Sequence, residues 1–123
     1  MAKILIMDDE PALRNVTFNI LKPSGHTLFL AEDGREAIEI ARKEKPDLAL
    51  LDIRVPGYPD GLEVLDELKK IDPSVKCIML SGFGDDDAAL DAISKGAFDY
   101  ISKPFKIDEV LGAVNKALGA KRG

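Results

Sequence analysis

Three aspartates of this sequence stand one or two residues after short apolar runs, a position at which charged side chains can do chemistry. Asp8 and Asp9 follow the run 4–7, and Asp52 follows the run 48–51. Carboxylates that lie close together raise one another's pKa and destabilise a fold unless a cation relieves the repulsion. Mg²⁺ suits this task, with Mn²⁺ as an alternative, because it binds one or two carboxylates, keeps several waters and accepts phosphate oxygens. The three aspartates are therefore a candidate metal site.

A hydroxyl group and an ammonium group complete the set. Ser81 directly follows the apolar run 77–80, and Lys103 stands two residues after the run 98–101. By itself, a serine usually closes a turn, a lysine is usually a solvated charge, and an acidic residue such as Glu10 favours the dipole of the helix that follows it. Only the combination is specific, and it predicts a site for an anion that binds together with a metal.

Five apolar runs alternate with five helical patterns and decide where these side chains can lie. The runs are residues 4–7, 27–31, 48–51, 77–80 and 98–101. Three of them are nearly continuous in Leu, Ile, Met and Val, which is typical of strands that are buried on both faces of a parallel sheet. Their alternation with helices predicts a doubly wound α/β sheet covered on both faces. Because the carboxyl ends of parallel strands share one edge, the candidate residues are expected to meet in one crevice.

The predicted helices are amphipathic, and some carry boundary signals. Pro11 suits the first position of a helix, and Asp33 with Glu36 predicts a capping box at the start of the second helix. The fourth helix, expected from about residue 85 to 95, has an apolar face of mostly alanine with Leu90 and Ile93. We therefore expect it to be the most loosely held helix.

Length and composition indicate one globular domain. The chain has 123 residues, of which 46% are hydrophobic, and a net charge of −5. This suits a single domain at 1–123 with its core at about 3–118 and a frayed tail at 119–123. The negative charge argues against binding to nucleic acid or to an anionic membrane. Cys77 is the only cysteine, which excludes a disulfide framework, and no apolar stretch is long enough to cross a membrane, so the cytoplasm is the expected location.

In this order and spacing, the motifs resemble the receiver domain of two-component response regulators over residues 3–118. The resemblance rests on Asp8-Asp9, Asp52 with Pro56 four residues later, Ser81, Phe98-Asp99-Tyr100 and Lys103-Pro104-Phe105. It implies a flavodoxin-like sheet of five parallel strands in the order 2-1-3-4-5, with five helices. The function that it implies is that of a phosphorylation switch, not an enzyme, with at most slow self-catalysed dephosphorylation.

The resemblance also implies roles for individual residues. Asp52 would accept a phosphoryl group from the phosphohistidine of a histidine kinase or of a histidine phosphotransfer protein. Asp9, Asp52 and the backbone carbonyl of Arg54 would bind Mg²⁺, and Asp8 would act through a metal-bound water. Lys103 would pair with a phosphoryl oxygen. Its peptide bond to Pro104 is expected to be cis.

The switch itself is implied in the same way. Ser81 would hydrogen-bond the phosphoryl group on Asp52, and Tyr100 would turn inward. The face of the fourth helix, the fifth strand and the fifth helix would then bind the downstream effector. The resemblance leaves open a dimer that forms on phosphorylation.

The sequence departs from the receiver pattern after the phosphoacceptor. A glycine usually stands eight residues after this aspartate, whereas Gly61 stands nine residues after Asp52. This is an apparent one-residue insertion, with Tyr58 and Pro59 in place of the usual apolar and acidic pair. We expect a changed loop beside the site and unchanged ligands.

Other functions share parts of this pattern. A phosphatase of the haloacid dehalogenase type needs a second aspartate two residues after the first, where this chain has Arg54. A flavodoxin-like electron carrier needs a phosphate loop rich in Ser, Thr and Gly in place of residues 8–10. His26, the only histidine, lies away from the predicted crevice, which argues against a kinase or a phosphotransfer module. A degenerate receiver, which binds partners without phosphorylation, is the main alternative.

Overall fold

Five parallel strands form one sheet with helices on both of its faces. A computed structural model describes residues 2–119 of the chain. The strands are β1 (Lys3–Met7), β2 (Thr27–Ala31), β3 (Leu48–Asp52), β4 (Lys76–Ser81) and β5 (Asp99–Ser102). Their order in the sheet is β2-β1-β3-β4-β5, and all neighbouring pairs are parallel. The predicted fold class and strand order are confirmed.

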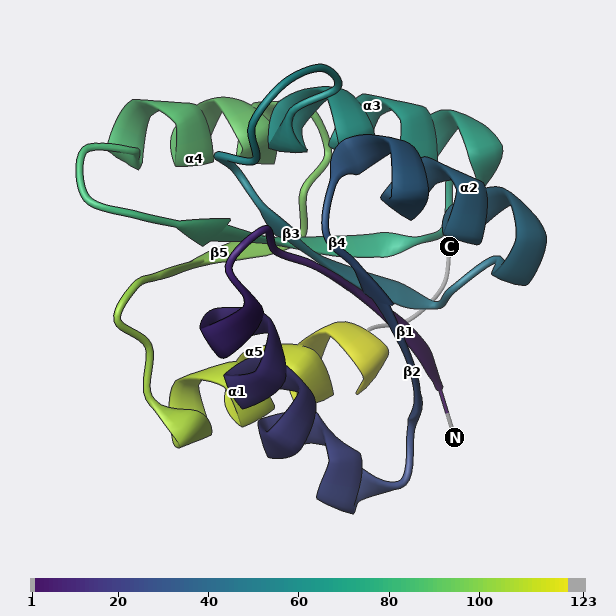
Figure 1. Ribbon diagram of the computed structural model, residues 1–123, viewed down its shortest axis with the longest axis vertical. Helices are drawn as coiled ribbons and strands as arrows, with labels where there is room; N and C mark the ends of the chain where they lie inside the picture. Colours follow the sequence, from purple (N-terminus) through teal and green to yellow (C-terminus); the bar gives the residue numbers. More distant parts are fainter. Residues whose placement is uncertain (1, 120–123) are drawn as a thin grey trace.

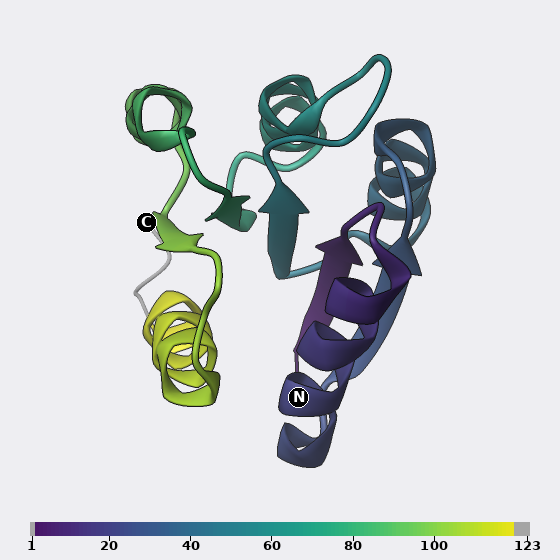
Figure 2. The same cartoon turned by 60° about the vertical axis from the view of Figure 1, so that its left-hand side comes forward.

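The helices divide between the two faces of the sheet (Figures 1 and 2). They are α1 (Pro11–Leu21), α2 (Gly34–Glu44), α3 (Gly61–Ile71), α4 (Asp86–Ser94) and α5 (Ile107–Gly119), with a short 3₁₀ helix, η1 (Lys22–Ser24), after α1. Helices α1 and α5 cover one face, and α2, α3 and α4 cover the other. Of the tail predicted to fray, Gly119 belongs to the last turn of α5, and 120–123 lie outside the described residues.

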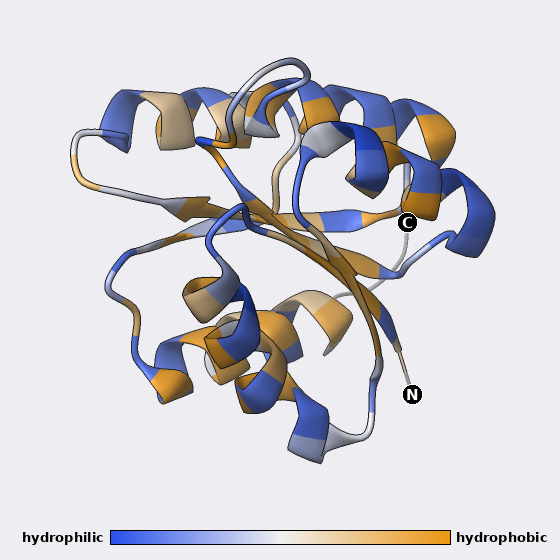
Figure 3. Ribbon diagram, in the orientation of Figure 1, coloured by the Kyte–Doolittle hydropathy of each residue, from blue (hydrophilic) through white to orange (hydrophobic). Residues whose placement is uncertain are grey.

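Each strand contributes to two separate cores, because successive side chains of a strand point to opposite faces. In β1, Ile4 and Ile6 pack toward α1 and α5, whereas Leu5 and Met7 pack toward α2–α4. Figure 3 shows the largely apolar sheet between helices that contain both polar and apolar residues. Cys77 belongs to the α2–α4 core, and burial raises the pKa of its thiol to about 12. Among the described helices, none has the length and apolar content of a membrane span.

Helix boundaries correct one detail of the sequence prediction. The Asp33 carboxylate accepts a hydrogen bond from the backbone N–H of Glu36 (2.9 Å), as a capping box requires. The Glu36 carboxylate, however, accepts from the N–H of Glu32 instead of Asp33, so the predicted box is only half formed. A complete capping box lies at the start of α3, between Asp60 and Glu63.

The packing of α4 differs from the sequence prediction. Its fully buried residues are Ala89 and Ala92. Leu90 and Ile93, which were expected on the apolar face, are 60% and 39% exposed. The helix therefore contacts the sheet mainly through small side chains. Its looser attachment stays a prediction.

The loop between β3 and α3 contains Tyr58 and Pro59, the residues of the apparent insertion. Gly57 has a positive φ of 81°, and the Tyr58–Pro59 peptide is cis. Beyond this loop, Gly61 returns to the end of β3, where its N–H donates to the carbonyl of Ile53 (3.2 Å). A Cβ atom on Gly61 would lie 2.2 Å from the backbone oxygen of Asp52. Only glycine allows α3 to begin this close to the end of the strand.

Replacement of Gly61 by alanine should therefore destabilise the fold. The new methyl group meets backbone atoms, which cannot move aside as a flexible side chain would, so we expect a loss of about 3 kcal/mol in the free energy of unfolding. Urea unfolding measures this loss. Gly112→Ala in α5 is the control, because its Cβ would meet nothing within 4 Å and alanine favours a helix by about 1 kcal/mol. Equal stability of the two variants would contradict the close approach at Gly61.

Candidate functional site

The carboxyl ends of β1 and β3 bring the three predicted aspartates together. These strands are neighbours, and Met7 pairs with Leu51, so the residues that follow them emerge side by side. One carboxylate oxygen from each of Asp8, Asp9 and Asp52 lies within 4.8 Å of the others. Asp8 and Asp52 are 0% and 4% exposed, and Asp9 is partly exposed. The predicted acidic cluster is present at the expected edge of the sheet.

Lys103 reaches this cluster from the loop after β5. Its Nζ donates a hydrogen bond to Asp52 Oδ2 at 3.0 Å and lies 3.6 Å from Asp8 Oδ2. The backbone N–H of Lys103 donates to the carbonyl of Ser81 (2.7 Å), and the Lys103–Pro104 peptide is cis, as expected. The loop is thus tied to the end of β4 while its ammonium group enters the crevice.

Burial and neighbouring charges have opposite effects on the pKa values of Asp52 and Lys103. Burial raises the pKa of the Asp52 carboxyl, and the hydrogen bonds from Lys103 and from the Arg54 N–H only partly offset this. Burial alone would lower the pKa of Lys103, but the carboxylates of Asp52, Asp8 and Glu10 outweigh it and raise that pKa. The ammonium group therefore stays charged at neutral pH. It faces more negative charge than it can neutralise.

The chemistry of the cluster fits a divalent cation. Asp8 Oδ1 accepts a hydrogen bond from the Glu10 N–H (3.0 Å). Asp8 Oδ2 is buried and has no hydrogen-bond partner among the described residues. A buried polar atom without a partner costs about 1–3 kcal/mol. An ion or a metal-bound water would satisfy it, and carboxylate oxygens are the ligands that hard cations prefer. The cluster can therefore hold a metal ion.

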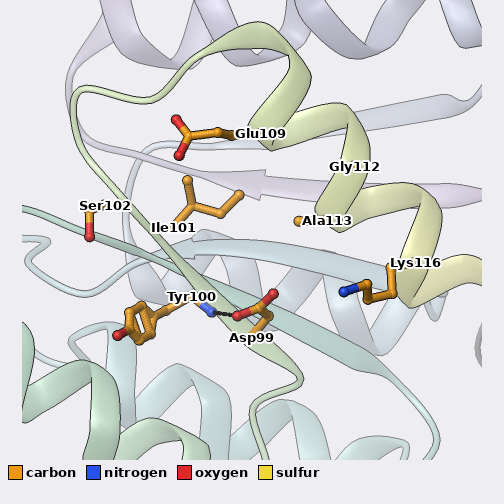
Figure 4. Close-up of a pocket in the computed structure, with 8 residues that line it drawn as sticks. All are labelled: Asp99, Tyr100, Ile101, Ser102, Glu109, Gly112, Ala113 and Lys116. Carbon is orange, nitrogen blue, oxygen red and sulfur yellow. Dashed lines mark hydrogen bonds between the residues drawn. The ribbon is translucent and has the colours of Figure 1, made fainter.

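Ser81 ends β4, the strand beside β3, and Tyr100 lies on β5, the strand beyond it. The Ser81 hydroxyl donates to the carbonyl of Ile101 (3.4 Å) and lies 3.5 Å from Ser102 Oγ, so in this state it faces β5. Tyr100 is partly exposed and packs against the α2–α4 core. Figure 4 shows it at the edge of a pocket of about 440 Å³ between β5 and α5, with its ring directed away from Gly112.

Asp85 also belongs to this region, although its sequence context did not indicate it. Its carboxylate is buried, forms an ion pair with the Arg54 guanidinium and accepts a hydrogen bond from the Gly82 N–H (2.8 Å). Burial would raise the pKa of this carboxyl, but the contacts with Arg54 and Gly82 outweigh burial and lower it. The only signal in the sequence is a run of three aspartates at 85–87, which the helix dipole explains equally well.

Known proteins match this chain over nearly its whole length. Residues 4–115 match the family described as response regulator receiver domain. The sporulation initiation phosphotransferase F of Bacillus subtilis is 39% identical over 119 residues, which cover 97% of this chain and 95% of the relative. The chemotaxis protein CheY of Listeria monocytogenes is 45% identical over 118 residues, which cover 95% and 98%.

Part of a longer protein and a solved structure also match nearly the whole chain. The DNA-binding transcriptional regulator NtrC of Escherichia coli is 38% identical over 94% of this chain, but the match spans only 24% of NtrC. The receiver domain of NtrX from Brucella abortus has a TM-score of 0.92 and 39% identity, over 96% of this chain and 99% of that domain. Together with the geometry of the acidic cluster, these matches show that the chain belongs to the receiver domain family of two-component response regulators.

Proposed function

We propose that Asp52 of this receiver accepts a phosphoryl group from the phosphohistidine of a histidine kinase or a histidine phosphotransfer protein in the cytoplasm. The observation that carries the proposal is the Asp52 carboxylate itself. It stands at the end of a buried strand, with the Lys103 ammonium 3.0 Å from one oxygen and the Arg54 N–H 3.0 Å from the other. The name of the Bacillus subtilis relative, which describes a phosphotransferase, supports it.

Phosphoryl transfer depends on positioning and on neutralisation of charge more than on covalent catalysis. An oxygen of Asp52 attacks phosphorus, the bond from phosphorus to the donor's histidine nitrogen breaks, and a mixed anhydride forms on Asp52. The two hydrogen bonds to the carboxylate fix its orientation before the attack. Lys103 balances negative charge on the phosphoryl oxygens. Because the product is labile, the switch can reset, and the chain needs no further enzymatic activity.

The proposal includes a divalent metal, Mg²⁺ or Mn²⁺, at the acidic cluster. Asp9 and Asp52 would bind it directly with the backbone carbonyl of Arg54, and Asp8 would act through a bound water. When bound, the metal supplies Lewis-acid neutralisation of the phosphoryl oxygens. The buried Asp8 oxygen that has no hydrogen-bond partner among the described residues supports this part of the proposal.

Ser81 and Tyr100 would transmit the phosphorylation of Asp52 to the surface of the domain. After phosphorylation, the Ser81 hydroxyl would leave the carbonyl of Ile101 and hydrogen-bond the phosphoryl group, and Tyr100 would turn inward. A shift of populations from 1:99 to 99:1 needs about 5.5 kcal/mol of differential stabilisation, which a few charge-assisted hydrogen bonds can largely supply. The effector would bind at α4, β5 and α5. A phosphorylation-independent interaction module is the alternative, but the complete set of acids with Lys103 favours the switch.

Phosphorylation should depend on Asp52 alone. Incubated with Mg²⁺ and acetyl phosphate, the wild-type protein should gain the mass of one phosphoryl group, and Asp52→Asn should gain none, because an amide cannot act as the acceptor. Intact-protein mass spectrometry measures both. Asp87→Asn, which changes an exposed aspartate outside the cluster, should be labelled like the wild type. Equal labelling of Asp52→Asn would assign the reaction to another residue.

Metal binding should depend on Asp9. Saturating Mg²⁺ should raise the melting temperature of the wild type, since a ligand at 100 times its Kd stabilises the folded state by about 2.7 kcal/mol. Asp9→Asn should abolish this shift while leaving the metal-free protein as stable as before or more stable, because one repulsive charge is gone. Thermal melts with and without Mg²⁺ test this. Asp108→Asn on the surface of α5 is the control, and a Mg²⁺ shift that survives Asp9→Asn would count against the site.

The output face should respond to occupation of Asp52. With Mg²⁺ and beryllofluoride, a mimic of the phosphoryl group, backbone NMR shifts should change from Ser81 through α4 to Tyr100 and α5. Ser81→Ala should still bind the mimic, but the change at Tyr100 should shrink because the hydroxyl that transmits it is absent. Changes confined to residues that touch Asp52 would show that this face takes no part.

A further inference from the structure

One ion pair connects the two loops that flank the phosphoacceptor. Arg54 belongs to the loop after β3, and Asp85 lies 31 residues later, directly before α4. The Arg54 backbone N–H donates to Asp52 Oδ1 (3.0 Å), while its guanidinium binds the Asp85 carboxylate. A single residue therefore contacts both the phosphoacceptor and the start of α4.

Asp85 does not act as an ordinary helix cap. It occupies the N-cap position of α4, yet within the described residues its carboxylate accepts no hydrogen bond from that helix. Its oxygens instead bind Gly82 N–H (2.8 Å) and Arg54. The Asp85 side chain is 3% exposed, whereas the Arg54 side chain is 72% exposed. The carboxylate is thus fixed and buried, and the arginine that neutralises it can turn in solvent.

The same contact holds the residue beside Ser81. Gly82 directly follows Ser81, and it is bound twice by Asp85, through the carboxylate and through the Asp85 N–H to the Gly82 carbonyl (3.2 Å). With Gly82 held in this way, the Ser81 hydroxyl faces the carbonyl of Ile101. The ion pair therefore accompanies the arrangement of the loop between β4 and α4 in which the Ser81 hydroxyl faces Ile101.

We infer that Arg54 is a second residue that responds to the phosphoryl group, and that Asp85 is its partner only in the unphosphorylated protein. This inference rests on the proposed phosphorylation of Asp52. A phosphoryl group adds about 1.5 to 2 negative charges beside Arg54, and a guanidinium binds phosphate oxygens with two parallel hydrogen bonds. Arg54 exchanges Asp85 for the phosphoryl group. Asp85 is then a buried carboxylate without its cation, which destabilises the resting loop and releases Gly82 and Ser81 toward Asp52.

Two variants that break the same ion pair test whether Arg54 exchanges Asp85 for the phosphoryl group. The alternative is a static bridge, an ion pair that stays formed whether or not Asp52 is phosphorylated. Asp85→Asn removes the charge but can still accept the Gly82 N–H through its amide oxygen. Arg54→Met removes the guanidinium and leaves the backbone carbonyl. In NMR titrations with beryllofluoride and Mg²⁺, Asp85→Asn should bind at least threefold more tightly than the wild type, since the resting partner of Arg54 is lost. Arg54→Met should bind at least threefold more weakly, since a contact to the mimic is lost.

Opposite signs are the result that a static bridge cannot give, because loss of such a bridge would move both variants in the same direction. Asp86→Asn, an exposed neighbour with the same change of charge, should stay within twofold of the wild type. Without the mimic, the amide shifts of Gly82 and Ser81 in Asp85→Asn should lie partway toward the wild-type bound positions.

Each other outcome overturns the inference. Shifts of the same sign in the two variants, or no shift in either, exclude the exchange while leaving phosphorylation of Asp52 intact. Arg54→Met alters an exposed side chain, so tighter or unchanged binding by that variant overturns the inference even if Asp85→Asn does not fold. If the wild type binds no beryllofluoride and gains no phosphoryl mass, the proposed function fails and the inference fails with it.

Discussion

The contact of Lys103 with Asp52 and Asp8 is the interaction on which the rest of the site depends. Two of the three carboxylates at this edge are buried, and burial raises the pKa of Asp52. Removal of one partner from a buried ion pair typically costs about 3–5 kcal/mol, a large part of the 5–15 kcal/mol or so that stabilises a domain. The Lys103 ammonium group thus offsets part of the negative charge of the buried carboxylates. The charge that remains can attract another cation.

The order of the strands in the sheet brings these side chains together. Strand β3 lies between β1 and β4, so Asp52 has the ends of both neighbours beside it. The two hydrophobic cores pack against both faces of these strands, so the polar side chains of the site stand at the carboxyl ends. Lys103 lies in the loop that follows β5, and the hydrogen bond from its backbone N–H to the Ser81 carbonyl (2.7 Å) holds this loop against β4. The position of the ammonium group therefore depends on the pairing of the whole sheet.

The sequence predicted the strands and the acidic cluster for the same reason. A strand buried on both faces is a continuous apolar run, and the first charged residue after it marks the edge of the sheet, as at Asp8 and Asp52. Asp85 could not be found in this way. It begins a run of three aspartates that look alike locally, and its role comes from an arginine 31 residues away. The half-formed capping box at Asp33 likewise depends on which backbone N–H the Glu36 side chain reaches.

Besides Lys103, two groups are proposed to contact the phosphoryl oxygens: the Ser81 hydroxyl and the Arg54 guanidinium. Each has another partner in this structure. Ser81 donates to Ile101, and Arg54 binds Asp85. Activation would then exchange contacts instead of only adding them, and the free energy available for switching would be the difference between two sets of hydrogen bonds. Such a difference stays small enough for the equilibrium to be reversible. A site in which every group already pointed at Asp52 would bind the phosphoryl group more tightly, but it would have no resting conformation to leave.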